Sequence, residues 1–292
     1  MSSVLVLVAN PLEPALDSKL VEAIQHETGG EINWLHQRIA CEVRDPKSAD
    51  PVATARQVIA GKPVDAALVP AANRRKMLLV ADMDSTMIEQ ECIDELADAV
   101  GIKEQVAEIT HRAMNGELDF EQALRTRVSL IKGLERKMIE EIRRERITLA
   151  PGGRALIHTM KAYGAYTSLV SGGFTFFAEY YAKRIGFDEA IANVLEFDEE
   201  QRLTGNVVPP IVDKTTKLNR LQALAAERAI PMEQTMAVGD GANDLDMIKA
   251  AGLGVAVHAK PHVAAEADVR IDFGDLTALL YLQGYEEEDI VR

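Results

Sequence analysis

The sequence of 292 residues contains no run of apolar residues long enough to cross a membrane, which takes about 18 or more in succession. Cysteine is equally scarce. Cys41 and Cys92 are far apart and lack the spacing of metal ligands, so a disulfide framework is not expected and both thiols are expected to be buried. No basic stretch precedes the apolar start of the chain, so a signal peptide is not expected and a cytoplasmic location is predicted.

Positive charge is in deficit as well. The chain has 32 Lys and Arg residues against 46 Asp and Glu residues, a formal net charge of −14. Nucleic acids and anionic membranes are held by an excess of Lys and Arg, so binding to either is not expected. An anionic small substrate would depend on a local cluster of basic side chains that acts against the overall charge.

The hydrophobic pattern of residues 1–74 predicts a small α+β domain. Short apolar runs of strand type alternate with two segments of helical period, in the order β-α-β-β-α-β. The polar segment "PAANRRK" follows and contains proline, which is typical of a linker. A domain boundary is therefore expected near residue 74.

Residues 75–292 are predicted to form an α/β domain with a Rossmann-like parallel sheet. A strand at residues 78–81 opens this domain, and residues 90–146 then have helical periodicity with few strand signals. Strands and helices alternate afterwards, which predicts parallel strands with helices on both faces of the sheet. The helical segment is therefore expected to be an inserted cap over a site at the edge of the sheet.

Polar residues follow three of the predicted strands. Asp82 and Asp84 follow "MLLVA", Ser171 follows "YTSLV" and Asp240 follows "TMAVG". Each group alone is typical of an ordinary strand-to-helix turn. The carboxyl ends of parallel strands meet, however, and carboxylates that gather there raise one another's pKa unless a cation joins them. Oxygen ligands of this kind suit Mg²⁺, and a metal beside helix N-termini favours phosphate, so phosphoryl transfer is predicted.

The motifs at these positions resemble those of the haloacid dehalogenase superfamily. "DMDST" is similar to its nucleophile loop, "LVSGG" to its second motif, a lysine before a helix to its third and "GDGANDLDM" to its fourth, in the expected order between residues 82 and 247. Within the superfamily, "DSTMIEQECIDELA" and "VGDGANDLDMIKAAGLGVAVHAKP" are similar to the phosphoserine phosphatase family. The resemblance implies Mg²⁺-dependent hydrolysis of O-phospho-L-serine to L-serine and phosphate, the last step of serine biosynthesis.

The resemblance also implies roles for the polar residues at the strand ends. Asp82 is implied as the nucleophile that forms an aspartyl-phosphate, and Asp84 as the acid that protonates the leaving oxygen and then the base that activates water. The implied Mg²⁺ ligands are the carboxylates of Asp82 and Asp240 and the backbone carbonyl of Asp84. Ser171 and the N–H group of Gly172 are implied as donors to the phosphoryl oxygens.

A lysine is implied to neutralise the charge of those oxygens. The family spacing favours Lys214, four residues before Leu218, and Lys217 is the alternative. A lysine in the first turn of a helix is ordinarily solvated, so the spacing alone does not decide between them. Asn243 is implied as a contact of the substrate or its phosphate, and Asp244 as a residue that orients the lysine or the water around the metal.

Phosphoserine carries an ammonium and a carboxylate besides its phosphate, so its site needs one further acid and one further base. Glu91 matches the family's ammonium-binding glutamate, and Arg127 its carboxylate-binding arginine, whose planar fork suits a carboxylate. Met114 and Phe120 are implied as apolar cover of the substrate, and Arg125 as a neighbour that faces solvent.

The order of elements in residues 1–74 resembles the ACT-like domains that precede some phosphoserine phosphatases. This resemblance is one of topology, so amino-acid binding, formation of a homodimer and a purely structural role all stay open. Two other functions stay open for the second domain: phosphoryl transfer to another hydroxyl group, and an amino-acid sensor without activity. The complete set of strand-end carboxylates argues against the sensor, because a binding protein has no need of so costly a cluster.

Overall fold

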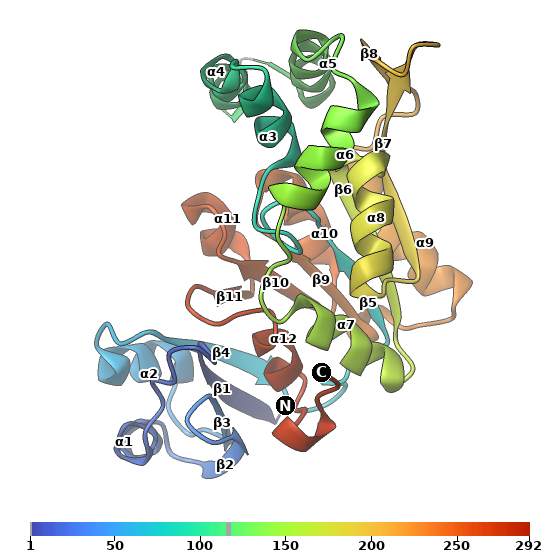
Figure 1. The fold of residues 1–292 in the computed structure, drawn as a ribbon. Coiled ribbons are helices and arrows are strands. Elements are labelled where there is room, and N and C mark those ends of the chain that lie inside the picture. Colours follow the sequence, from blue (N-terminus) through green and yellow to red (C-terminus); the bar gives the residue numbers. More distant parts are fainter. Residues whose placement is uncertain (1, 115–117) are drawn as a thin grey trace.

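The chain folds into two β-sheets, each covered by helices (Figure 1). The computed structural model describes residues 2–114 and 118–292, and the side chains of residues 111, 113 and 114 lie outside this description. No helix among the described residues is both long and apolar enough to reach across a lipid bilayer.

The first sheet belongs to the N-terminal part of the chain. Its elements are β1 (Ser3–Ala9), α1 (Ser18–Thr28), β2 (Glu31–His36), β3 (Ala40–Arg44), α2 (Pro51–Ile59) and β4 (Val64–Pro70). The four strands are antiparallel in the order β2-β3-β1-β4. Side chains alternate along β1, so Leu5 and Leu7 pack under the two helices while Val6 lies on the opposite face. That opposite face is also buried, because α12 (Ala278–Leu282) packs against it.

A buried carboxylate holds the N-terminal sheet to the C-terminal part of the chain. Asp65 of β4 accepts hydrogen bonds from the backbone N–H groups of residues 272, 273 and 274, at 2.8, 3.1 and 2.7 Å. Arg74, in the segment after β4, forms an ion pair of 2.7 Å with the buried Glu42. Arg74 also donates from Nε to the Leu282 carbonyl at 3.3 Å, so it too joins the first sheet to the C-terminal part of the chain.

The second sheet has seven strands. They are β5 (Leu78–Ala81), β6 (Tyr166–Phe174), β7 (Glu189–Phe197), β8 (Leu203–Val208), β9 (Thr235–Gly239), β10 (Leu253–Val257) and β11 (Val269–Ile271). Their order is β11-β10-β9-β5-β6-β7-β8, with all pairs parallel except the β7–β8 hairpin. The predicted fold class is confirmed: a parallel α/β core preceded by a small antiparallel sheet. The central strand β5 therefore has β6 and β9 as its neighbours.

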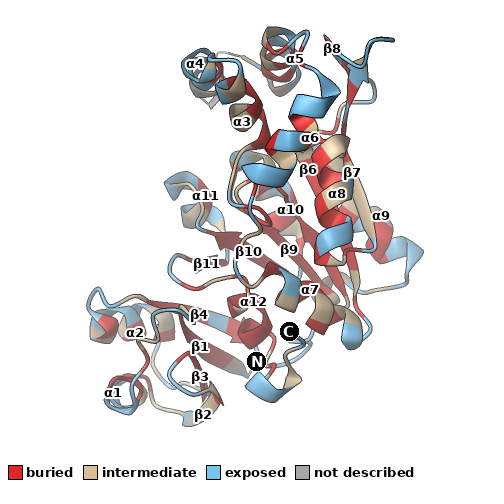
Figure 2. Ribbon diagram, viewed as in Figure 1, coloured by how far each residue is buried: buried red, intermediate tan, exposed pale blue. Residues whose placement is uncertain are grey.

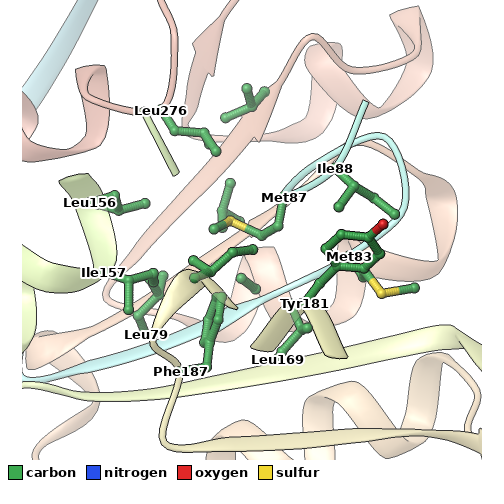
Figure 3. Packing of buried hydrophobic residues seen from close by; sticks show 14 of the residues in the cluster. Leu79, Met83, Met87, Ile88, Leu156, Ile157, Leu169, Tyr181, Phe187 and Leu276 are labelled. Carbon is green, nitrogen blue, oxygen red and sulfur yellow. The ribbon is translucent and has the colours of Figure 1, made fainter. Parts of the chain in front are cut away.

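Helices cover both faces of this sheet. They are α7 (Gly153–Ala162), α8 (Thr175–Ile185), α9 (Lys214–Glu227), α10 (Leu245–Ala250) and α11 (Pro261–Glu266), with short 3-10 turns η1 (Met232–Gln234), η2 (Ala242–Asp244) and η3 (Glu287–Asp289). Leu79 of β5 packs with α7 and α8, while Leu78 packs on the other face with α9 and α10. The strands are accordingly buried from both sides (Figure 2). Met83 and Met87, from the segment after β5, also lie in the core (Figure 3), which anchors that segment.

Among its described residues, the insertion between β5 and α7 contains four helices. They are α3 (Cys92–Ala99), α4 (Lys103–Met114), α5 (Phe120–Leu130) and α6 (Arg136–Glu145), and Figure 1 shows α3 to α5 at the end of the molecule opposite the N-terminal sheet. The loop between α5 and α6 pairs with β8, because the N–H of Gly133 donates to the Leu203 carbonyl at 2.7 Å. The insertion is therefore held beside the β7–β8 hairpin.

Candidate active site

The polar residues at the strand ends lie together, because β6, β5 and β9 are neighbours in the sheet. Asp82 follows β5, Asp240 follows β9, and Ser171 lies in the last part of β6. The N–H of Asp82 donates to the Val238 carbonyl at 3.0 Å, which extends the pairing of β5 with β9 by one residue. Burial of all three side chains sets them apart from ordinary turn residues.

A buried lysine lies between two carboxylates of this site. Lys217 of α9 has a side chain that is 0% exposed, and its Nζ is 2.6 Å from Asp82 Oδ1 and 2.6 Å from Asp244 Oδ1. Burial alone would lower the pKa of Lys217, but the charges of Asp244 and Asp82 raise it above its usual value. The lysine is therefore held as an ammonium ion.

The expected position of Lys214 in the site is corrected by the structure. Its side chain is 63% exposed, and it approaches the carboxylate of Asp246 at 3.8 Å. Lys214 is the first residue of α9, whereas Lys217 lies one turn further along, where the helix packs against β5 and β6. Motif spacing alone did not separate two lysines three residues apart, but the packing of the helix on the sheet does.

Three buried carboxylates form a group that could hold a metal ion. Oxygen atoms of Asp82, Asp240 and Asp244 all lie within 4.8 Å of one another. One further contact within this group is the hydroxyl of Thr86, which donates to Asp240 Oδ1 at 3.4 Å. The negative charge of three carboxylates exceeds the single positive charge of the Lys217 ammonium. Carboxylate oxygens are hard donors, which suit a divalent cation. The residues therefore fit a divalent metal site.

The pKa values of these groups rise mainly because the groups are buried. Burial raises the pKa of Asp82 well above its usual range, the charges of Asp244 and Asp240 add to the effect, and Lys217 opposes it. Burial, followed by the charges of Asp244 and Glu91, raises the pKa of Asp240 to about 7. Such carboxylates bind either a proton or a cation near neutral pH.

The carboxylate group differs in one member from the set expected for the metal. The sequence reasoning placed Asp244 outside the ligands, yet its carboxylate belongs to the buried group, and its Oδ2 accepts from the N–H of Gly241 at 3.0 Å. Gly239 permits this approach, because a Cβ atom there would lie 2.3 Å from Asp244 Cγ. The carboxylate of Asp84 is not a member of the group and points elsewhere.

Asp84 contacts the start of the insertion, at α3, and the end of β6. Its Oδ1 accepts from the N–H of Cys92 at 2.8 Å, and its Oδ2 accepts from the Ser171 hydroxyl at 3.2 Å. Burial, followed by the charge of Glu91, raises the pKa of Asp84 to about 6. The next residue, Ser85, has a φ of 55°, so the chain turns sharply after the two carboxylates.

Two glycines after Ser171 allow close approach of other groups. A Cβ atom on Gly173 would lie 2.5 Å from Asp84 Oδ2, and one on Gly172 would lie 3.1 Å from the ring of Phe120. The N–H of Gly173 donates to the Ser171 hydroxyl at 2.9 Å. Phe120, the first residue of α5, therefore brings the insertion against the loop of residues 171–173.

The insertion supplies an acid and a base near Asp84. Glu91 precedes α3, is partly buried, and accepts a hydrogen bond of 2.7 Å from the Ser85 hydroxyl. Arg127 of α5 is partly buried and donates from Nη1 to the Thr110 hydroxyl at 3.4 Å. Burial lowers the pKa of Arg127, while the charges of Glu91, Asp94 and Asp84 oppose this effect. These acids therefore lie close enough to Arg127 for their charges to act on it.

Of the remaining predicted residues, Arg125 and Asn243 have side chains that the structure describes. Arg125 is 43% exposed and paired with Glu121 at 2.7 Å, as expected of a residue that faces solvent. Asn243 lies in η2, partly buried, and a Cβ atom on Gly241 would lie 2.4 Å from its Oδ1. Met114 ends α4, and its side chain lies outside the described part of the structure.

A cavity of about 460 Å³ opens between the start of α5 and the segment before α9. It is lined by Asp119, Phe120, Glu121, Arg125, Pro209, Ile211 and Asp213. Because Phe120 belongs both to this wall and to the surroundings of Gly172, the cavity lies next to the loop of residues 171–173.

Three residues of the site escaped the sequence reasoning: Thr86, Cys92 and Asn193. Thr86 stands in the quoted motif, so its hydroxyl was available as a candidate partner for a carboxylate. Cys92 acts through its backbone N–H, and Asn193 of β7, away from every motif, donates from Nδ2 to the Gly172 carbonyl at 2.8 Å. Only the three-dimensional arrangement reveals these two.

Comparison with known proteins decides the family. The haloacid dehalogenase-like hydrolase family matches residues 79–249, from β5 into α10. The chain belongs to this family. The phosphoserine phosphatase of Streptomyces coelicolor is 45% identical to this chain over 229 residues, which cover 78% of the present chain and 55% of that protein. The phosphoserine phosphatase of Haemophilus influenzae is 48% identical over 206 residues, which cover 70% of the chain and 65% of that protein.

A solved structure extends the likeness over nearly the whole chain. The probable phosphoserine phosphatase of Vibrio cholerae is 34% identical, with a TM-score of 0.79 that covers 98% of this chain and 88% of that one. The resemblance stated from the motifs is confirmed. The chain nevertheless matches only part of the length of these two curated relatives, 55% of the first and 65% of the second.

Proposed function

We propose that this hydrolase splits O-phospho-L-serine into L-serine and phosphate, with Mg²⁺ as its metal and as the last step of serine biosynthesis. The observation that carries the proposal is the buried Lys217 between Asp82 and Asp244. The carboxylate of Asp240 lies beside Asp82 and Asp244, and the hydroxyl of Ser171 contacts Asp84, two residues after Asp82. The site thus combines a carboxylate nucleophile, a fixed positive charge and donors for phosphoryl oxygens, which together suit phosphoryl transfer.

In the first half of the proposed reaction, Asp82 attacks the phosphorus atom. A bond forms between a carboxylate oxygen of Asp82 and phosphorus, and the bond from phosphorus to the seryl oxygen breaks. Asp84 gives its proton to the leaving oxygen, so L-serine departs with its hydroxyl group restored. A pKa of about 6 supports this role, because the carboxyl can hold and release a proton near neutral pH.

In the second half, water hydrolyses the aspartyl-phosphate. Asp84, now ionised, takes a proton from the water as the water oxygen attacks phosphorus. The bond from phosphorus to the Asp82 oxygen breaks, which releases phosphate and restores the nucleophile. Lys217 and the hydroxyl of Ser171 stabilise negative charge on the phosphoryl oxygens in both halves.

The proposed ligands of Mg²⁺ are the carboxylates of Asp82 and Asp240 and the backbone carbonyl of Asp84, with Asp244 beside them. When bound, the metal supplies positive charge to the phosphoryl oxygens and offsets the repulsion among the carboxylates. The support for this site is the buried group of three carboxylates with raised pKa values.

The choice of phosphoserine is proposed to come from the cap. Glu91 binds the substrate ammonium, and Arg127 binds its carboxylate. Both side chains are partly buried near Asp84, and Arg127 lies within reach of the charge of Glu91. Phe120 and Met114 provide apolar cover, and Asn243 contacts the substrate. The intact carboxylate group speaks against a sensor without activity.

The experiment that tests this function is phosphate release from L-phosphoserine, with and without Mg²⁺, against a panel of small phosphate esters. Rapid metal-dependent release with a preference for L-phosphoserine is expected. Release without that preference would remove the roles of Glu91 and Arg127 and keep the chemistry. Exchange of labelled serine into phosphoserine would indicate transfer to a second hydroxyl group, and no release from any ester would refute the proposal.

We further propose that residues 1–74 form an ACT-like domain, that the protein is cytoplasmic, and that a homodimer forms through this domain. The free outer edge of β2 in the described four-stranded sheet supports the homodimer, since an edge strand can pair with a second copy. Light scattering of the full chain tests the homodimer, and the mass of a single chain at all concentrations would refute it.

A further inference from the structure

Asn193 is a fully buried side chain of β7 that hydrogen bonds to backbone groups on two sides of the site. Its Nδ2 donates to the Gly172 carbonyl at 2.8 Å and to the Val212 carbonyl at 3.2 Å. Its Oδ1 accepts from the N–H of Val212 at 2.8 Å. The side chain is 0% exposed, so its amide has no solvent to replace these partners.

The register of β6 and β7 explains why a side chain is needed here. Val170 pairs with Ile191, and the next pair joins Phe174 to Asn193. Residues 171–173 of β6 thus stand opposite a single residue of β7 and bulge out of the ladder. A bulge leaves backbone groups without a partner on the next strand, and the Asn193 amide provides the partner for the Gly172 carbonyl.

This hydrogen bond fixes one end of a chain that reaches Asp84. The carbonyl of Gly172 and the N–H of Gly173 belong to the same peptide group, and the N–H donates to the Ser171 hydroxyl at 2.9 Å. The hydroxyl in turn donates to Asp84 Oδ2 at 3.2 Å. Rotation of that peptide would break both hydrogen bonds and release the Ser171 hydroxyl from its direction.

The other two hydrogen bonds of Asn193 fix the approach to α9. Val212 precedes Asp213, which caps the helix by accepting from the N–H of Thr216 at 2.9 Å. Lys217 follows one residue later and reaches Asp82 and Asp244 from this first turn. A single amide therefore joins the loop that carries Ser171 to the helix that carries Lys217.

We propose that Asn193 is a positioning residue for phosphoryl transfer, which holds the loop of residues 171–173 and the start of α9 at a fixed separation. The inference rests on the proposed phosphatase function and deepens it. Ser171 and Lys217 act on the phosphoryl oxygens, whereas Glu91 and Arg127 act on the rest of the substrate. Loss of Asn193 therefore affects all phosphate esters to a similar extent.

The test is Asn193→Asp, which keeps the volume and the acceptor for Val212 but removes the donor to both carbonyls. We expect kcat/KM to fall by on the order of 10²-fold for L-phosphoserine and for p-nitrophenyl phosphate alike, because small displacements in an active site cost about this much. The inhibition constant of orthovanadate, which occupies the phosphoryl position, should rise by a similar factor. Activity should recover in part at lower pH, where a protonated carboxyl can again donate one hydrogen bond.

The matched control is Thr235→Val, at the start of β9 and away from the site. Thr235 is also fully buried and bonds two backbone groups, the Met232 carbonyl at 2.7 Å and the Gly252 N–H at 3.1 Å. This variant should lower the melting temperature without a change in vanadate inhibition. An Asn193→Asp variant that behaves in the same way would overturn the positioning role.

Hydrogen exchange separates this inference from the proposed function. In Asn193→Asp the amide of Gly173 should exchange faster than in Thr235→Val, whatever the activity of the wild type, because the peptide between Gly172 and Gly173 loses its fixed end. A wild type active on p-nitrophenyl phosphate alone would refute the phosphoserine substrate and leave the Asn193 test intact. If the wild type acts on neither ester, the proposed function fails. Exchange of the Gly173 amide at the wild-type rate in Asn193→Asp would then also refute the positioning role of Asn193. Should Asn193→Asp not fold, Asn193→Ser is measured in its place, and failure of both to fold would assign Asn193 to the fold alone.

Discussion

The Nζ atom of Lys217 lies 2.6 Å from Oδ1 of Asp82, and both side chains are shielded from solvent. The ammonium thus touches the carboxylate that is proposed to attack phosphorus. In water such a pair would contribute little, but burial makes the loss of either partner costly, because the other charge is left unpaired. The same lysine also touches Asp244 at 2.6 Å, so one side chain orders two carboxylates.

Replacement of this lysine tests its role directly. Lys217→Met should lower the free energy of unfolding by about 3–5 kcal/mol, because it leaves two buried carboxylates without their cation. Activity should fall by on the order of 10²–10³-fold through the loss of charge at the phosphoryl oxygens. Lys214→Met is the control on the same helix and should leave kcat unchanged, since that side chain is exposed. Equal losses in the two variants would contradict the assignment.

The nucleophile is tested by Asp82→Asn. An amide does not form an acyl-phosphate, so turnover should be abolished while circular dichroism shows an unchanged fold. Acid quenching with ³²P-labelled phosphoserine should leave label on the wild-type protein and none on the variant. Asp246→Asn is the control on the neighbouring helix α10, where the carboxylate is 47% exposed, and it should retain the label. Labelled Asp82→Asn protein would rule out this nucleophile.

The recognition of the substrate carboxylate is tested by Arg127→Ala. Loss of a charged hydrogen-bond partner should raise KM for L-phosphoserine roughly 10- to 100-fold. The KM for p-nitrophenyl phosphate should change little, because that ester has no carboxylate. Arg125→Ala, two residues away and paired with Glu121 at the surface, is the control and should alter neither value. An equal loss on both esters would show that Arg127 acts on the phosphate or on the structure of the cap.

Metal binding should depend on pH in a defined direction. In the metal-free protein the pKa of Asp240 is raised to about 7. Between about pH 4 and 7 the folded state therefore keeps a proton on this carboxyl group, whereas the unfolded state has lost it. The stability of the metal-free protein should therefore fall as the pH rises through that window and stay low above it. Mg²⁺ replaces the proton, so its effect on the melting temperature should be larger at pH 8 than at pH 6.

Calorimetry with and without Mg²⁺ at the two pH values measures this difference. Asp240→Asn removes one of the three carboxylates and should reduce the Mg²⁺-dependent shift at pH 8. Asp246→Asn again serves as the control. A shift that is larger at pH 6 would contradict a site built from carboxylates with raised pKa values.

The sequence by itself determined much of the fold and the chemistry. Apolar runs such as residues 78–81 predicted buried parallel strands, and the helical period of residues 90–146 predicted the four helices inserted after the first of them. Asp82 and Asp240 were predicted because polar residues directly after buried strands meet at one edge of a parallel sheet. These features depend on local pattern and on general rules of sheet topology, which a sequence carries within short segments.

Tertiary structure alone decided which neighbouring side chains enter the site. Lys217 rather than Lys214 is buried, because the packing of α9 against the sheet sets how far each side chain reaches. Asp244 joins the carboxylate group because Gly239 allows its close approach. Asn193 contacts the loop of residues 171–173 only because the register of β6 and β7 shifts at that point. Each outcome depends on distances between segments far apart in the chain, and such distances are absent from any local pattern.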